Sequence, residues 1–149
     1  MSVVAHTYTK LGTSMSKKLV NLETDALKVA LLSSYTVTTS QDTAQFYSDV
    51  VTAGVGVETS GTGYTAGGLA LTSISGSVSG HVYTLTCANP VWTTSTIAAA
   101  YALFYDSTPG SAGTNPVICY WDFGGTVSST GASFTLTISG SGLLTLTGS

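Results

Sequence analysis

The sequence predicts an all-β fold, an antiparallel β-sandwich of the jelly-roll or immunoglobulin-like kind with about eight strands. Apolar residues and threonines alternate from Phe134 to Ile138, so an extended strand there has one apolar and one polar face. Two other runs, 27–32 and 97–105, are apolar on both faces, which is typical of central strands covered on both sides. Clusters of Gly, Ser, Asn and Pro separate these runs, as turns require.

In chain order, the first expected element is a basic N-terminal arm, residues 1–16, followed by a single domain, residues 17–149. A Ser or Asp cap ahead of Phe46 and Val50, which lie four residues apart, predicts one short helix near 42–50. The stretch Ser-Gly-Ser-Gly at 139–142 predicts a hairpin between the last two strands. The strands are expected at 18–21, 27–33, 69–74, 82–87, 97–105, 117–123, 134–138 and 143–147.

The composition predicts a poorly charged surface. Only 7% of the 149 residues are charged, whereas 43% are apolar, which is enough to offset the entropy cost of folding. A dispersed monomer normally relies on many surface charges of both signs. We therefore expect neighbouring subunits to cover much of this surface, in a homo-oligomer such as a trimer.

The distribution of charge argues against nucleic-acid binding. The chain has no arginine, and its four lysines, Lys10, Lys17, Lys18 and Lys28, are too few for the dense basic patch that phosphate neutralisation needs. A membrane partner is not expected either, because the longest apolar run, 97–105, is about half the length of a transmembrane helix. The first residues lack the pattern of a secretory signal, so we expect no export and synthesis in a reducing cytoplasm.

A glycine-rich stretch at 61–68, GTGYTAGG, fits a loose form of the dinucleotide-binding loop. Such a loop needs a helix after it and an acidic residue about 20 positions on. Here a strand pattern follows, and no acidic residue occurs between Glu58 and Asp106. A Walker loop needs a lysine, and none follows Lys28. We therefore expect no cofactor, and we predict that these glycines permit positive φ and a tight reversal before a strand.

The residues that could support catalysis do not form a known pattern, and we expect no enzymatic activity. His6 lies in the predicted arm and His81 at the start of a strand, where both are expected in solvent or at an interface. Asp106 and Asp122 could approach each other as a carboxylate pair, but each fits a turn or a strand exit. No spacing typical of a metal site occurs.

Two cysteines, Cys87 and Cys119, lie far apart in the chain and outside any C-x-x-C motif. Buried thiols in core strands are the simpler interpretation for a protein made in a reducing cytoplasm. A disulfide stays open at this point, because it depends on whether the fold brings the two Cα atoms within about 7 Å.

Aromatic residues alternate along two expected strands, 97–105 and 117–123, so some rings face away from any one core. Such rings suit a carbohydrate-binding platform or a subunit interface, and the scarcity of charge favours the interface. The predicted interface residues, including the lysines of the arm, are Lys10, Lys17, Lys18, Tyr101, Tyr105 and Trp121.

Six segments are notable for their order along the chain. They are DALKVALLSSYT at 25–36, FYSDV at 46–50, GTGYTAGGLALT at 61–72, NPVW at 89–92, AAAYALFYD at 98–106 and YWDFGG at 120–125. Together they resemble a family of small structural proteins of tailed bacteriophages, usually found among the head-assembly proteins beside the major capsid protein.

That resemblance implies a component of the virion, on the surface of the phage head. The leading hypothesis is a capsid decoration, or cement, protein that binds the major capsid protein and stabilises the shell, with lysines of the arm against acidic capsid surface. Cementing would work by burial, since each added contact removes roughly 1,200–2,000 Å² from water and symmetry multiplies weak contacts. The alternatives are a tail or neck component, or a fibre module that binds host glycans; the chain has no heptad stalk or repeat to support a fibre.

Overall fold

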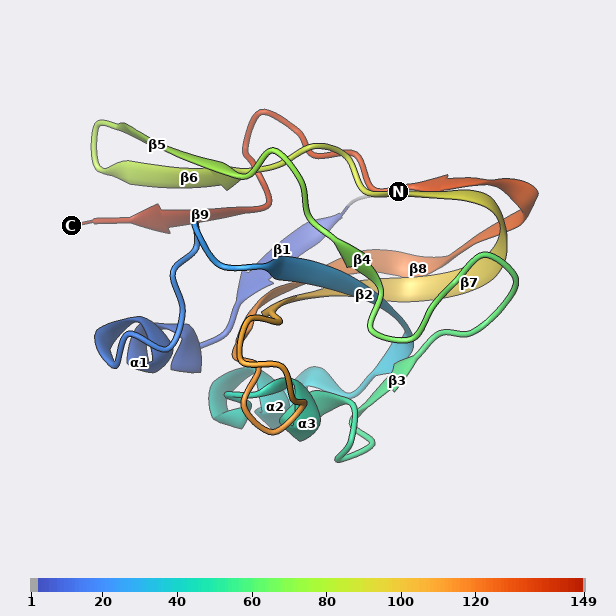
Figure 1. Ribbon diagram of the computed structural model, residues 1–149, viewed down its shortest axis with the longest axis horizontal. Coiled ribbons are helices and arrows are strands. Elements are labelled where there is room, and N and C mark those ends of the chain that lie inside the picture. The colour runs from blue at the N-terminus through green and yellow to red at the C-terminus, as the bar shows by residue number, and fades with distance from the viewer. Residues whose placement is uncertain (1–2, 149) are drawn as a thin grey trace.

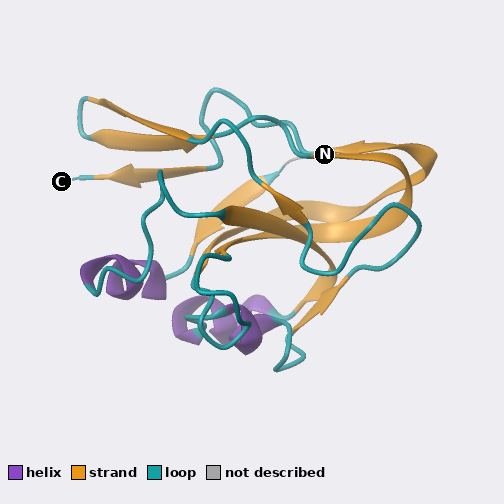
Figure 2. Ribbon diagram, viewed as in Figure 1, coloured by secondary structure: helices purple, strands orange, loops and turns teal. Residues whose placement is uncertain are grey.

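Two antiparallel β-sheets make up most of the protein in the computed structural model, which describes residues 3–148 (Figures 1 and 2). The larger sheet has the strand order β1-β8-β7-β2-β3, with β4 also paired to β2, and the smaller sheet has the order β5-β6-β9. This confirms the all-β sandwich class. The strands are β1 (Val4–Thr7), β2 (Leu27–Tyr35), β3 (Gly56–Glu58), β4 (Leu69–Ala70), β5 (Ser75–Ser79), β6 (Val82–Thr86), β7 (Val91–Asp106), β8 (Val117–Thr135) and β9 (Leu144–Thr147), and the helices are α1 (Lys10–Ser16), α2 (Val37–Thr43) and α3 (Tyr47–Val50).

Most of strand β2 and the second half of β7 are buried on both faces, as their continuous apolar runs predicted. On β2, Val29 contributes to one core and Ala30 to another, and Phe104 and Tyr105 divide in the same way on β7. The first core lies toward the smaller sheet, which contributes residues such as Leu85. The second core is covered by the helices α2 and α3 instead of by another sheet (Figure 2). The larger sheet therefore packs against the smaller sheet on one face and against helices on the other.

The hairpin of β7 and β8 is much longer than the sequence predicted. Both strands were expected to be short, and the Gly- and Ser-rich stretch 124–131 was expected to be a turn, but β8 continues through it to Thr135. Bulges make this possible: Asp122 pairs with Tyr101 and Val127 with Ala99, so residues 123–126 lie opposite one residue of β7. The Gly-rich stretch 76–80 likewise falls mostly within β5 rather than in a turn.

The first residues do not form the extended arm that we predicted for 1–16. Strand β1 pairs with β8, from Val4 opposite Asp122 to Thr7 opposite Cys119, and α1 follows it. Tyr8 and Leu11 are almost completely buried, three positions apart, so they anchor this segment to the core. Two buried side chains in a short polar segment do not produce a recognisable periodicity, which explains the wrong prediction. Residues 1 and 2 lie outside the described residues.

Three local predictions also need correction. The expected strand at 18–21 is a turn and loop. The expected hairpin across 139–142 is absent from residues 3–148, because β9 pairs with β6, whereas β8 pairs with β7. The single helix near 42–50 is two helices, α2 and α3, separated at 44–46, where Phe46 forms a bridge with Pro116. The carboxylate of Asp49 accepts hydrogen bonds from the backbone N–H groups of Gln45 and Phe46 and so fixes the start of α3.

Candidate functional site

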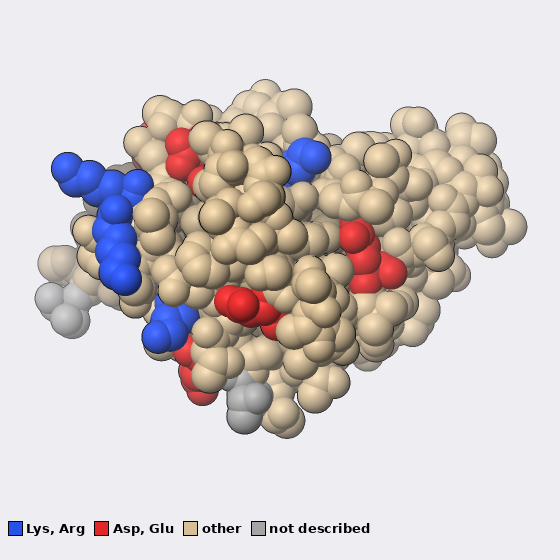
Figure 3. All heavy atoms as spheres, turned by 60° about the horizontal axis from the view of Figure 1, so that its bottom comes forward, with Lys and Arg blue, Asp and Glu red and all other residues tan. Residues whose placement is uncertain are grey.

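The three lysines predicted to form an interface lie at one end of the molecule, around α1. Lys10 is the first residue of α1, and Lys17 and Lys18 follow its last residue, where both are exposed. Figure 3 shows the basic side chains gathered at this end. We call Lys10, Lys17 and Lys18 the lysine end.

The aromatic residues predicted to form an interface are placed differently. Tyr105 is 4% exposed and Trp121 is 6% exposed, so the prediction of a surface role is wrong for both. The Trp121 indole N–H donates to the Leu143 carbonyl at 3.0 Å, and the Tyr105 hydroxyl donates to the Gly67 carbonyl at 2.8 Å. Tyr101 is half-buried, with its ring edge-on to another tyrosine. The alternation of rings was correct, but the continuous apolar run 97–105, which predicted cover on both faces of this strand, was the better guide to where the rings lie.

On the face shown in Figure 3, no charged side chain is visible at the opposite end of the molecule. This end is formed by the part of the β7–β8 strand pair where β7 begins and β8 ends (Figure 1). After Glu58, the sequence contains only two charged residues, Asp106 and Asp122, and neither lies in this part of the hairpin. We define the neutral ribbon as the exposed residues within 91–98 and 128–135, which are threonine, serine, alanine, glycine and one valine.

The outward face of the neutral ribbon is composed of small side chains, and two register shifts, between Trp92 and Ser95 and between Ser95 and Ile97, interrupt its pairing. Ala98 pairs with Ser128, and Val91 pairs with Thr135, and all four are exposed. The inward face differs, because Trp92 and its neighbours on this part of the hairpin are buried in the core. The neutral ribbon therefore lies on a well-supported strand pair and can contact another protein without removing a charge from water.

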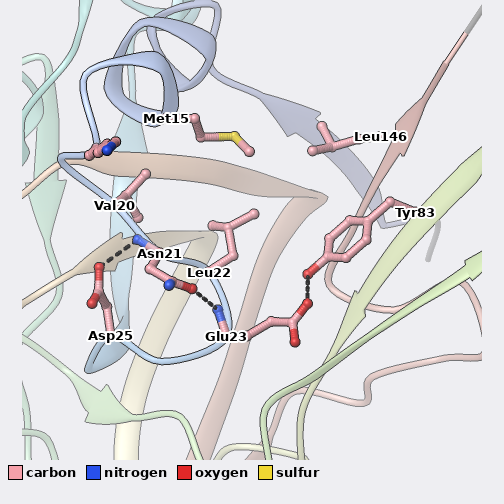
Figure 4. Close-up of a pocket in the computed structure, with 9 residues that line it drawn as sticks. Met15, Val20, Asn21, Leu22, Glu23, Asp25, Tyr83 and Leu146 are labelled. Carbon is pink, nitrogen blue, oxygen red and sulfur yellow. Dashed lines mark hydrogen bonds between the residues drawn. The ribbon is translucent and has the colours of Figure 1, made fainter.

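A groove of about 710 Å³ lies between α1, the segment that follows it and the smaller sheet (Figure 4). Its apolar lining comes from Met15 and Leu146, which face each other across it, with Leu22 below. On the polar side, the Tyr83 hydroxyl donates to the Glu23 carboxylate at 2.9 Å. The groove is therefore apolar with a charged rim, a surface suited to a side chain of another protein.

A half-buried carboxylate explains the glycine-rich loop that superficially resembles a nucleotide site. Glu58, on β3, accepts hydrogen bonds from the hydroxyls of Tyr47 at 2.8 Å and Tyr64 at 2.7 Å and from the backbone N–H of Gly67 at 2.5 Å. Burial and the adjacent Glu58 carboxylate raise the pKa of both tyrosine hydroxyls, so they stay protonated and donate. The loop is thus held closed over the sheet, and its polar groups are used internally.

Sequence reasoning missed this network. The available signal was that Glu58 is the last acidic residue before a long uncharged stretch and immediately precedes the glycine-rich loop. The prediction for the loop itself is confirmed, because Gly61, Gly63, Gly67 and Gly68 all have positive φ and the strand β4 follows.

The two acidic residues considered as a carboxylate pair are not together. Asp122 pairs with Tyr101, five residues from Asp106 along β7, a distance of about 17 Å. Asp106 instead lies beside Asp25, because Leu27 at the start of β2 is its partner in the sheet. Its side chain is completely buried.

The remaining candidate groups are placed as follows. His6 stacks on Tyr120 at a centroid distance of 4.8 Å, and His81 is exposed in the turn before β6. Cys87 and Cys119 are free, buried thiols, and burial raises the pKa of Cys87 to about 11 and that of Cys119 further.

Within residues 3–148, no group of three or more His, Cys, Asp or Glu side chains is placed to hold a metal ion. No helix of the described part of the chain has the length and apolar character needed to cross a bilayer.

Comparison of the chain with protein-family models, with curated proteins and with solved structures finds no match. The resemblance to phage structural proteins therefore rests on the six sequence segments. The arguments for function rest on the surface geometry described above.

Proposed function

We propose that the protein is a structural component of a bacteriophage virion, a decoration protein that binds the outer head shell and stabilises it by surface contact, without catalysis. The observation that carries this proposal is the neutral ribbon. Burying this uncharged face against another protein removes no charge from water, so it costs less than burying a charged face when its hydroxyls find hydrogen-bond partners.

The size of the molecule suits such a role. Its accessible surface is 7186 Å². A standard protein interface covers roughly 800 Å² on each partner, so one such contact would use about a ninth of this surface. The neutral ribbon and the lysine end lie at opposite ends (Figures 1 and 3), so both can be in contact at the same time.

We assign different partners to the two ends. The neutral ribbon would bury against a subunit of the shell, and the lysine end would contact acidic surface on the neighbouring capsomer. A small protein held at both ends bridges two capsomers, and repetition over the symmetric shell multiplies a weak contact. The scarcity of surface charge also supports association of this chain with itself, for which the oligomeric state in solution is the direct test.

The experiment that tests this proposal is a count of copies in purified virions by quantitative mass spectrometry. On the order of hundreds of copies, as shell symmetry requires, would support decoration of the head. Tens of copies would support the tail, and a dozen or fewer would support the neck. Particles that lack the protein should also rupture at a lower temperature than complete particles; equal rupture temperatures would contradict a cementing role.

The glycan-binding alternative has little structural support. It depended on exposed aromatic rings, but Tyr105 and Trp121 are buried. The large apolar side chains that are exposed in the described part of the chain are valines, a leucine and a methionine, rather than aromatic residues.

A further inference from the structure

The end of β7 contains a buried carboxylate oxygen that no donor satisfies. Asp106 is 0% exposed, and its Oδ1 accepts a hydrogen bond from the Thr108 backbone N–H at 2.8 Å. Its Oδ2 is also buried but has no hydrogen-bond partner. An ionised carboxylate in this position would leave a charged oxygen without compensation, which costs several kcal/mol.

Besides the Thr108 backbone N–H, two groups face the Asp106 carboxyl: the Thr108 hydroxyl and a second carboxyl. Asp25 lies within hydrogen-bonding reach of Asp106. The backbone around the pair is well connected: the Ser107 N–H donates to the Ala26 carbonyl at 2.9 Å, and the Ala26 N–H donates to the Thr108 hydroxyl at 2.8 Å. Asp25 itself accepts the Asn21 N–H at 2.5 Å through Oδ2. Each carboxyl thus has one oxygen engaged by a backbone N–H.

We propose that Asp25 and Asp106 share a single proton, and that this proton latches the segment before β2 to the end of β7. The Asp106 carboxyl carries the proton and donates it to Asp25, so the orphaned Oδ2 becomes a hydrogen-bond donor and one negative charge is removed. The latch closes as pH falls and opens as pH rises, because two carboxylates in contact repel each other.

The surroundings favour the protonated form. Burial raises the pKa of Asp106, and the negative charge of Asp25 raises it further, whereas the hydrogen bonds from Thr108 lower it. The folded protein therefore holds the proton at pH values where the unfolded chain has lost it. Stability from this pair is fully present below the ordinary value of 3.8 and is lost as pH rises through the raised value.

The other charged groups near the pair do not replace the proton. Lys18 and Glu23 line the same groove as Asp25, and Glu23 is engaged by the Tyr83 hydroxyl. Lys28 follows on β2, but its ammonium lies near Gly67. The loop 107–116 and the start of β8 contain no titratable side chain before Cys119.

A divalent cation is the competing occupant, and the geometry favours it less. Calcium takes six to eight oxygen ligands, and this pair offers about two free carboxylate oxygens. We therefore include calcium as an outcome of the test.

The test measures unfolding of the full chain by urea between pH 4 and pH 8, a range that begins just above the ordinary pKa of an aspartate. For the wild type, the unfolding equilibrium constant should rise with pH by up to tenfold per pH unit within the window between the two pKa values. Asp106→Asn supplies a permanent amide donor to Asp25, so this variant should be less pH-dependent and more stable than the wild type at pH 8. The control variant is Asp122→Asn. In the wild type, the Asp122 carboxylate accepts a hydrogen bond from the Gly124 backbone N–H and is not paired with a second carboxylate. This variant should therefore keep the pH dependence of the wild type.

Carbon NMR titration of the aspartate carboxyls in the wild type gives an independent readout that does not depend on variants folding. One carboxyl should titrate well above the ordinary range of about 3.9. The proposal is overturned if all the aspartates titrate at or below that range, if wild-type stability does not fall toward pH 8, or if Asp106→Asn is less stable than the wild type throughout. Stabilisation by calcium chloride in the wild type, lost in Asp106→Asn, would also overturn it in favour of a cation site.

Discussion

Replacing Gly68 with alanine should destabilise the fold severely, because the backbone of β2 occupies the space that a side chain would need. Gly68 has a φ of +73°, and an ideal Cβ there would lie 1.8 Å from the Val29 carbonyl oxygen and 2.7 Å from the Ala30 Cα. Real Cβ contacts are essentially never shorter than 3.0 Å, so the loop and the central strand would have to separate by 1.2 Å. Neither of these atoms belongs to a flexible side chain.

The magnitude follows from what that separation would break. A left-handed conformation costs alanine about 1–2 kcal/mol. Moving the loop would also weaken the β4–β2 pairing and the two hydrogen bonds of Gly67, to Glu58 and from Tyr105, at about 1 kcal/mol or more each. We expect Gly68→Ala to lower the free energy of unfolding by about 3–5 kcal/mol.

The matched control is Gly54→Ala. Gly54 has a φ of +75°, but an ideal Cβ there meets nothing within 4 Å. This variant should therefore show the conformational cost alone, about 1–2 kcal/mol. Urea unfolding followed by tryptophan fluorescence measures both variants. A difference of less than about 1 kcal/mol between them would refute the steric explanation of the glycine-rich loop.

Two further predictions concern buried polar groups and thiols. Tyr64→Phe should cost about 1–3 kcal/mol of unfolding free energy, because it removes one of the donors to Glu58 and leaves the Leu31 backbone N–H, which donates to the Tyr64 hydroxyl at 3.0 Å, without that acceptor. Tyr83→Phe in the open groove should cost less than about 1 kcal/mol, and equal losses in urea unfolding would contradict this. Cys87 and Cys119 should resist alkylation in the native protein at pH 8 and react quickly in denaturant, because both thiols are buried. Burial raises the pKa of Cys87 from 9.0 to about 11, which lowers the fraction of thiolate at this pH roughly a hundredfold. Rapid alkylation of either native thiol, measured by intact mass, would show that the site opens.

The parts of the fold that could be predicted are the strands whose own residues follow a recognisable pattern of apolar and polar positions. The runs 27–32 and 97–105 are apolar on successive positions, and they are the doubly covered strands β2 and β7. The sequence of a strand does not show which other strands it pairs with. Strand β9 follows a Ser-Gly-Ser-Gly turn yet pairs with β6, where Leu144 lies opposite Leu85 and both join the first core.

Glycine and serine were the main source of error. The stretch 124–131 has the composition of a turn, but pairing with β7 and bulges keep it extended. For the candidate site, the exposed lysines were predictable from charge alone. The helices that cover Tyr105 were not predictable as its neighbours, because α2 and α3 lie more than 50 residues earlier in the chain. Asp25 and Asp106 meet for the same reason, through pairing of distant strands.

Binding of the purified protein to phage heads that lack it is the most direct test of docking through the neutral ribbon. Cosedimentation should compare the wild type with Ser128→Lys, which places a charge on the ribbon, and with Thr52→Lys, which places the same charge on an exposed turn elsewhere. Both variants should unfold like the wild type. We expect Ser128→Lys to weaken binding at least about tenfold, because its ammonium must be desolvated at the interface, and Thr52→Lys to bind like the wild type. Wild-type binding by Ser128→Lys, or no binding by the wild type itself, would contradict the proposed function.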